Sequence, residues 1–145
     1  MKESAEMDAA ALAERLVLAL GDPDQIDELV TDDIEWWITP TVEVLGSPCV
    51  GRGPVIAAMR VIFSELWLEP AVTVHHKLGA DDIGAVRFTL QAKAHFADDK
   101  PYENEYTMWI RRSGDRIDRV WEYLDVAWSM AQLGFDTGDR GGSSA

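Results

Sequence analysis

Long apolar runs, basic residues and cysteines are all scarce in this chain. No apolar stretch approaches the ~18–20 residues needed to span a bilayer, and the first ten residues lack the basic-then-apolar layout of a secretory signal. The single cysteine, Cys49, can form neither an intramolecular disulfide nor a cysteine metal cluster, which fits a reducing compartment. We therefore expect a cytoplasmic protein in which Cys49 has a packing role.

The shortage of positive charge limits the choice of partner. The chain has 13 Lys and Arg against 26 Asp and Glu, a formal net charge of −13 at pH 7. Such an acidic surface repels phosphate backbones and anionic lipid headgroups. Nucleic acids and membranes are therefore not expected as partners.

Several catalytic and cofactor motifs are missing as well. The chain has no glycine-rich phosphate loop, and no Ser-His-Asp order or Cys-His pair is recognisable. His75 and His76 are adjacent in a predicted strand and so face opposite sides, without a carboxylate spaced to complete a metal site. We expect no metal and no cofactor, so any reaction must rely on acid–base groups in a shaped apolar cavity.

The first half of the chain has the pattern of amphipathic helices. At 145 residues the chain is long enough to bury one core. Between residues 9 and 20, apolar side chains recur at intervals of three and four, which predicts a helix with one buried face. We expect three such helices: one that Gly21 ends, one that begins after the N-cap Asp22, and one that runs from Gly53 until Pro70 ends it.

The second half has the pattern of antiparallel strands. Over Ile83–Phe96 apolar and polar residues alternate, as in a half-buried strand. Tyr102–Arg112 and Arg116–Val126 form a predicted hairpin about Ser113–Asp115, and Ala127–Leu133 a closing helix. Helices followed by antiparallel strands indicate an α+β fold, with helices packed on one face of the sheet and a cavity between them.

Two short runs carry a family resemblance. They are the hairpin segment GDRIDRVWEYLD (114–125) and the loop-to-helix step VGRGP (50–54). With the order of elements, they resemble the SnoaL-like family of the nuclear-transport-factor-2-like superfamily, which includes polyketide cyclases, ketosteroid-isomerase relatives and limonene-epoxide-hydrolase-like enzymes. The resemblance covers about residues 9–134, and it implies a fold more strongly than a reaction.

The resemblance implies a cone-like, cystatin-like roll. In this roll, three N-terminal helices pack on the concave face of a bent antiparallel sheet. Residues 1–134 would form the SnoaL-like domain, and residues 135–145 a disordered polar tail.

The epoxide-hydrolase branch of that family gives the most informative comparison. Its catalytic set is an Asp–Arg–Asp triad, whose last-strand acid falls here on Glu122. The middle-strand Arg and Asp positions fall on Thr89 and Gln91, and the water-positioning Tyr and Asn positions fall near Trp36 and Ile38. Of these three triad positions, one carries an acid in this chain and the other two carry neutral residues. This argues against an epoxide hydrolase of the family type.

Strand pairing predicts which residues share the pocket. A three-residue hairpin loop places Met108 opposite Val120 and Tyr106 opposite Glu122. The more apolar face of the hairpin then carries Asn104, Tyr106, Met108, Val120, Glu122 and Leu124. If the register is shifted by one residue, Arg119, Trp121 and Tyr123 line the pocket instead.

Glu122 is the candidate catalytic residue. An ionised carboxylate on an apolar face is costly unless it has a partner, so we expect a raised pKa or a hydrogen bond. Carboxyl groups with raised pKa values serve as general acids or bases near neutral pH. The alternative is a strand-edge acid paired with Arg87 or Arg119.

Other residues allow two interpretations each. His95 is either a base or, being next to a turn, a solvated rim residue, and Asp125 is better interpreted as the N-cap of the closing helix. Trp36 either contacts ligand or fills the core. Trp109 and Trp121 lie together on the outer face, as the core of a homodimer interface would.

Two functions remain open from the sequence. The first is a cofactor-independent isomerase, cyclase or epoxide-opening hydrolase acting on a small apolar cyclic or polyketide-like substrate. Glu122 is its acid or base, and the substrate-binding residues are Trp36, Ile38, Gln91, Asn104, Tyr106, Met108 and Val120. The second is a non-catalytic protein that binds a small apolar ligand or a partner. A second polar group close to Glu122 would favour the enzyme.

Overall fold

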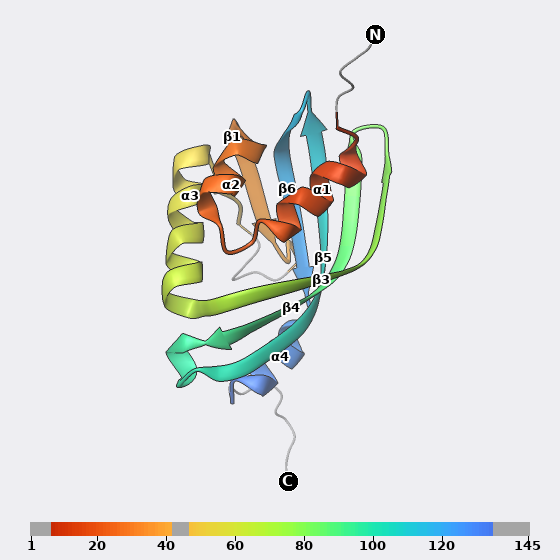
Figure 1. The fold of residues 1–145 in the computed structure, drawn as a ribbon. Coiled ribbons are helices and arrows are strands. Elements are labelled where there is room, and N and C mark those ends of the chain that lie inside the picture. The colour runs from red at the N-terminus through yellow and green to blue at the C-terminus, as the bar shows by residue number, and fades with distance from the viewer. Residues whose placement is uncertain (1–6, 42–46, 135–145) are drawn as a thin grey trace.

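The computed structural model describes residues 7–41 and 47–134, in which helices cover one side of a strongly bent sheet (Figure 1). The helical segments are α1 (Ala9–Leu18), α2 (Pro23–Leu29), α3 (Arg52–Val61), the π-helical turn η1 (Ile62–Leu66), the 3-10 turn η2 (His95–Ala97) and α4 (Val126–Gln132). The strands are β1 (Val30–Ile38), β2 (Cys49–Val50), β3 (Trp67–Ala80), β4 (Ile83–Ala94), β5 (Lys100–Ser113) and β6 (Arg116–Leu124).

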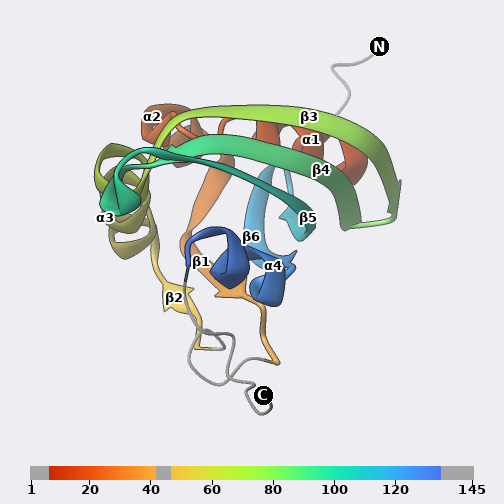
Figure 2. The same ribbon diagram turned by 90° about the horizontal axis from the view of Figure 1, so that it is seen from below.

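The six strands form one sheet in the order β2-β1-β6-β5-β4-β3. Figure 2 shows the long strands β3 and β4 curving strongly along their length. The α+β fold, the bent sheet and its three N-terminal helices confirm the expectation from the sequence. One detail differs, because β1 pairs with β6 in parallel and the sheet is therefore mixed. These two strands lie at opposite ends of the chain, so no hairpin signal links them.

Aspartate side chains cap the first two helices, and Asp22 was the predicted cap of the second. The side chain of Asp8 accepts a hydrogen bond from the Ala11 N–H at 2.7 Å, and that of Asp22 accepts one from Gln25 at 3.3 Å. The sequence predicted that Pro70 ends the third helix, but Pro70 lies within β3. It sits in an irregularity of this edge strand, where a residue without an N–H is tolerated.

The β5–β6 hairpin has a different register from the predicted one. Met108 lies opposite Glu122, and Tyr106 lies opposite Leu124. The turn is one residue shorter than expected, since Ser113 pairs with Arg116, and the pairing also shifts by one residue between Arg111 and Arg112. Together the two changes move the register by two residues. Because strand side chains alternate with a period of two, the predicted faces are retained.

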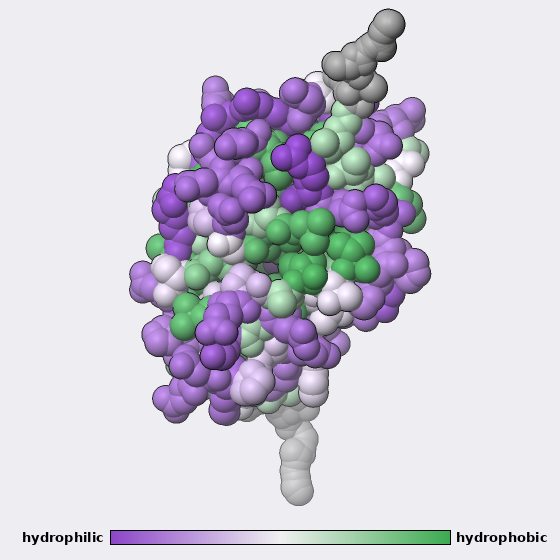
Figure 3. Space-filling model, viewed as in Figure 1, coloured by the Kyte–Doolittle hydropathy of each residue, from purple (hydrophilic) through white to green (hydrophobic). Residues whose placement is uncertain are grey.

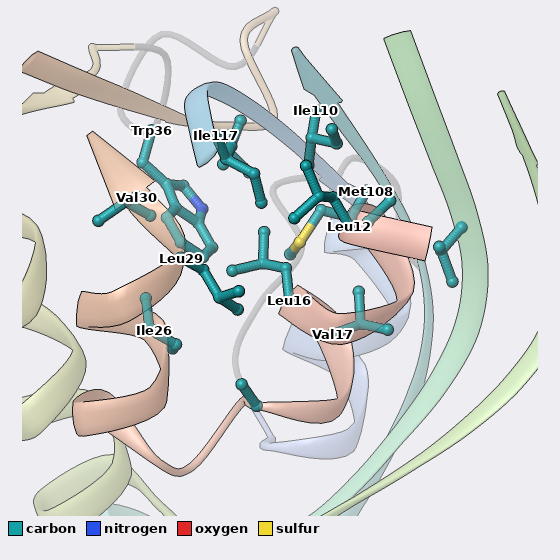
Figure 4. Close-up of a cluster of buried hydrophobic side chains, with 14 of the residues drawn as sticks. Leu12, Leu16, Val17, Ile26, Leu29, Val30, Trp36, Met108, Ile110 and Ile117 are labelled. Atoms are coloured by element: carbon teal, nitrogen blue, oxygen red, sulfur yellow. The ribbon is translucent and has the colours of Figure 1, made fainter. Parts of the chain in front are cut away.

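The core lies between α1 and the sheet. Helix α1 packs across β3, β4 and β5, and Leu12, Leu16 and Val17 are almost fully buried there. Figure 4 shows Leu16 at the centre of this cluster, with Met108 beside Leu12 and the Trp36 ring on the far side. In the described part of the chain, no helix is long and apolar enough to cross a membrane. The proposed tail, residues 135–145, lies outside the described residues.

Candidate functional site

Beyond the end of α1, the concave side of the sheet encloses a cavity of about 290 Å³. Its lining is apolar or aromatic except for the carboxyl group of Glu122. Tyr106 and Trp67 are aromatic residues that also carry a polar atom. The lining residues are Leu20, Ile38, Met59, Ile62, Phe63, Leu66, Trp67, Leu90, Tyr106, Glu122 and Leu124. On this side of the molecule, hydrophobic surface gathers around a small hollow near the centre (Figure 3).

The π-helical turn η1 builds one wall of the cavity. It continues α3 without a break and contributes Ile62, Phe63 and Leu66. These three side chains are only partly buried, because they face open space rather than packed neighbours. Such π-helical turns occur frequently at functional sites.

Glu122 and Trp36 form a hydrogen-bonded pair beside this cavity. The Trp36 Nε1 atom donates to Glu122 Oε1 at 2.9 Å, and the parallel pairing of β1 with β6 brings the two residues together. Burial raises the pKa of Glu122 to about 7, although the bond from Trp36 lowers it in part. Glu122 thus exchanges a proton close to neutral pH.

Glu122 is not the surface ion-pair partner that the alternative interpretation required. Arg87 pairs with Glu105 at 2.7 Å, and Arg119 lies 3.4 Å from Glu35. Both arginines lie on the outer face of the sheet with their partners. The carboxyl group of Glu122 therefore faces an apolar space, with an indole as its hydrogen-bond donor.

A second residue with a polar group, Tyr106, lines the same cavity, and its hydroxyl belongs to a buried hydrogen-bond network. It lies 2.7 Å from the Tyr102 hydroxyl, which also receives a hydrogen bond from Asn104 Nδ2 at 3.1 Å. Asn104 in turn donates to the backbone oxygen of Asp125 at 2.9 Å. Burial, Tyr102 and Glu122 raise the pKa of Tyr106 above its ordinary value, so its hydroxyl stays protonated. It can therefore donate a hydrogen bond to a ligand.

The structure brings some of the predicted site residues together. Glu122, Tyr106 and Ile38 line the cavity. Trp36 is almost fully buried and contacts Glu122 through its indole nitrogen, so it serves the core and the site together. Asn104 lies behind the cavity wall, where it supports the tyrosine pair.

Three predicted residues lie elsewhere. Gln91 is exposed on the outer face of the sheet, where it donates to Glu103 at 2.7 Å, because the alternation of β4 turns Leu90 inward instead. Met108 and Val120 are fully buried in the core. They share the face of Glu122, but they belong to the packed hydrophobic core and do not line the cavity.

Sequence reasoning missed most of the apolar wall. Phe63 and Leu66 lie on the apolar stripe of the predicted third helix, which was a usable signal, whereas nothing local marked Trp67. The Trp67 ring lies 4.2 Å from that of Tyr102 and 5.4 Å from that of Phe96, measured between centroids. This contact fixes the first residue of β3 against the tyrosine pair.

The remaining candidates have other roles. Asp125 caps α4, since its side chain accepts a hydrogen bond from Trp128 N at 2.9 Å, as predicted. His95 is exposed and lies 2.9 Å from Asp99, outside the cavity. Over residues 7–41 and 47–134, no group of three or more His, Cys, Asp or Glu side chains is arranged to hold a metal ion.

Comparison with known proteins gives a family and a fold. Residues 10–120 match the model of the SnoaL-like domain. No curated protein sequence matches the chain. Among solved structures, one similar fold is that of a hypothetical protein from Catenulispora acidiphila, which has a ketosteroid isomerase-like fold and was solved in complex with trimethylamine. It is 15% identical to this chain, and its TM-score is 0.74. The match covers 89% of this chain and 96% of that protein.

Two further structures have named activities. IdmH from Streptomyces antibioticus, a candidate polyketide cyclase, is 20% identical, with a TM-score of 0.71 over 88% of this chain and 99% of its own. An epoxide hydrolase from M. tuberculosis, like limonene epoxide hydrolase, is 16% identical, with a TM-score of 0.70 over 86% of this chain and 88% of its own. At these identities the likeness concerns the fold.

Proposed function

We propose that this chain, which belongs to the SnoaL-like domain family, is a cofactor-independent enzyme that moves a proton next to a carbonyl group. Its substrate is a small, apolar cyclic or polyketide-like molecule held in the cavity of Glu122. The observation that carries this proposal is a carboxyl group with a pKa of about 7 that shares an apolar cavity with the Tyr106 hydroxyl. A general base is most effective when its pKa lies near the working pH.

The two polar groups have complementary roles. A substrate carbonyl oxygen accepts a hydrogen bond from Tyr106, and the Glu122 carboxylate removes a proton from the adjacent carbon. The negative charge then moves to the oxygen, where a preorganised donor in a dry site stabilises it most strongly. Trp36 holds Oε1 of Glu122, which leaves the other oxygen for the substrate.

The fate of the enolate distinguishes two reactions. If protonated Glu122 returns its proton to a different carbon, the reaction is an isomerisation. If the enolate carbon attacks a second carbonyl of the same molecule, a carbon–carbon bond forms, the attacked oxygen takes the proton, and the reaction is an aldol-type cyclisation. Both reactions need only the groups present in the cavity.

Opening of an epoxide has weaker support. The middle-strand positions that correspond to the Arg and Asp of the epoxide-hydrolase branch are Thr89 and Gln91, which lie outside the cavity. A purely ligand-binding role has weaker support too, because binding an apolar molecule does not need a second polar group beside an acid. Tyr106 is such a group.

The test is exchange of the protons next to a carbonyl. Cyclic ketones such as 2-tetralone are incubated with the protein in deuterium oxide, and deuterium uptake is followed by NMR. We expect the wild type to accelerate uptake and Glu122→Gln to lose at least ~10²-fold of that rate, the lower range for removal of a general base. Glu28→Gln, which changes an exposed acid on α2, is the control. Full exchange activity in Glu122→Gln would reject the proposal.

A further inference from the structure

A second, smaller cavity of about 80 Å³ adjoins the main one. Ile38, Met59 and Ile62 belong to the walls of both. The smaller cavity, here called the side lobe, is otherwise lined by Trp36, Ser47, Cys49, Val55 and Ala58. Because Trp36 also donates to Glu122, the carboxyl group lies at the boundary between the two spaces.

The side lobe has the size and chemistry of a site for a short alkyl group. Protein interiors leave few voids larger than a water molecule, and apolar voids stay dry and accept apolar guests. The side lobe has roughly half the volume of a ~150 Å³ cavity that holds benzene. Apart from a hydroxyl and a thiol, its lining is apolar.

We propose that the side lobe selects substrates that carry an alkyl branch of about two or three carbons beside the reacting carbonyl unit. The ring or chain of the substrate lies in the main cavity, and the branch passes between Ile38, Met59 and Ile62. This inference rests on the proposed function in taking the main cavity as the substrate site. It adds a substrate class that Glu122 and Tyr106 alone do not define.

Ala58 and Cys49 set the length of the accepted branch. Ala58 lies on α3 and contributes only a methyl group, so any larger side chain there would occupy the side lobe. Cys49 lies on β2 directly opposite Trp36 of β1. The preceding residue of the helix, Ala57, is exposed and does not line either cavity, so it is a matched control.

The experiment is a binding series with 2-alkylcyclohexanones, whose branch lies on the carbon next to the carbonyl, measured by calorimetry on the full chain. The substituents are hydrogen, methyl, ethyl, propyl and pentyl. For the wild type we expect affinity to rise about 3–4-fold for each carbon up to propyl, the value for burying one methylene group, and no further for pentyl. In Ala58→Leu the longer ketones should bind no better than cyclohexanone itself. Ala57→Leu should give the wild-type series.

Cys49 supplies a readout that needs no substitution, because it is the chain's single cysteine. At equal occupancy, 2-propylcyclohexanone should slow alkylation of Cys49 by N-ethylmaleimide at least threefold more than cyclohexanone does. A flat affinity series, or equal protection by both ketones, would overturn the inference and leave the role of Glu122 standing. If affinity rises up to propyl as expected but Glu122→Gln keeps full exchange activity, the side lobe is a site for the alkyl branch and the proposed enzymatic function is rejected. If none of the ketones binds, both proposals fail.

Discussion

The indole nitrogen of Trp36 lies 2.9 Å from Glu122 Oε1, although the two residues are 86 positions apart in the chain. Parallel pairing of the first and last strands creates this contact. The hydrogen bond favours the ionised carboxylate and burial disfavours it, and burial has the larger effect. The pair therefore sets the pH at which Glu122 can act as a base.

Replacing Trp36 by Phe should move the pH dependence of activity upward. The substitution removes the hydrogen-bond donor and leaves the burial, so the pKa of Glu122 should rise above about 7. We expect the midpoint of the rising limb of the ketone exchange rate to shift to higher pH, with a smaller effect on the plateau. The measurement is the exchange rate between pH 5 and 9 for both proteins. A lower rate at every pH with an unchanged midpoint would show that Trp36 only shapes the cavity.

Glu122 should reduce the stability of the fold above neutral pH. Its pKa is raised from 4.5 to about 7 in the folded state, so the folded state binds its proton more tightly than the unfolded chain does. The resulting stabilisation of wild type is complete below pH 4.5 and is lost as the pH rises through 7. The loss amounts to at most about 3 kcal/mol.

Glu122→Gln removes this titration and tests the sign. The free energy of unfolding is measured with urea for both proteins at pH 5 and pH 8. The value for the variant minus that for wild type should be higher at pH 8 than at pH 5. Glu28→Gln, at an exposed site, should show no such difference. If Glu122→Gln changes the stability equally at the two pH values, the pKa of Glu122 in the folded wild type is close to that in the unfolded chain.

The face of each residue was predictable from the sequence, but its position along the sheet was not. The period of two placed Tyr106 and Glu122 on one face, and it stayed correct although the pairing was wrong by two residues. Which part of that face is covered depends on where α1 crosses it. This is a long-range packing outcome, and it placed Met108 in the core and Tyr106 in the cavity. Gln91 was predicted to bind substrate, although the alternation of apolar and polar residues in its strand placed it on the polar, outer face. The alternation was correct.

Two glycines allow a matched test of how α1 is placed. A Cβ atom on Gly84 would overlap the backbone carbonyl of Ala9 at the start of α1, whereas one on Gly53 would meet nothing within 4 Å. We expect Gly84→Ala to destabilise the fold by about 1–3 kcal/mol, the range for overpacking. Gly53→Ala, in the first turn of α3, should be neutral or stabilising by up to about 1 kcal/mol. Urea unfolding of both variants is the measurement, and equal stabilities would show that α1 can shift at little cost.

We propose finally that the outer face of the sheet joins two copies of the chain. Trp109 and Trp121 lie directly opposite each other on β5 and β6, and with Ile83 and Tyr123 they line a shallow hollow. Trp109 and Tyr123 are each 39% exposed, and contiguous aromatic surface of this kind is unusual on a monomer. Sedimentation at micromolar concentration should therefore show a dimer.

Trp109→Glu should convert that dimer into a monomer, because two like charges would then be buried at the centre of the interface. Leu78→Glu is the control, since Leu78 is also an exposed apolar residue but lies on the edge strand β3, outside this hollow. Both variants should retain the wild-type circular dichroism spectrum. A wild-type monomer at micromolar concentration, or a Trp109→Glu variant that remains dimeric, would assign the aromatic face another role. In the dimer, the cavity of Glu122 faces away from the interface because it opens on the opposite, concave side of the sheet.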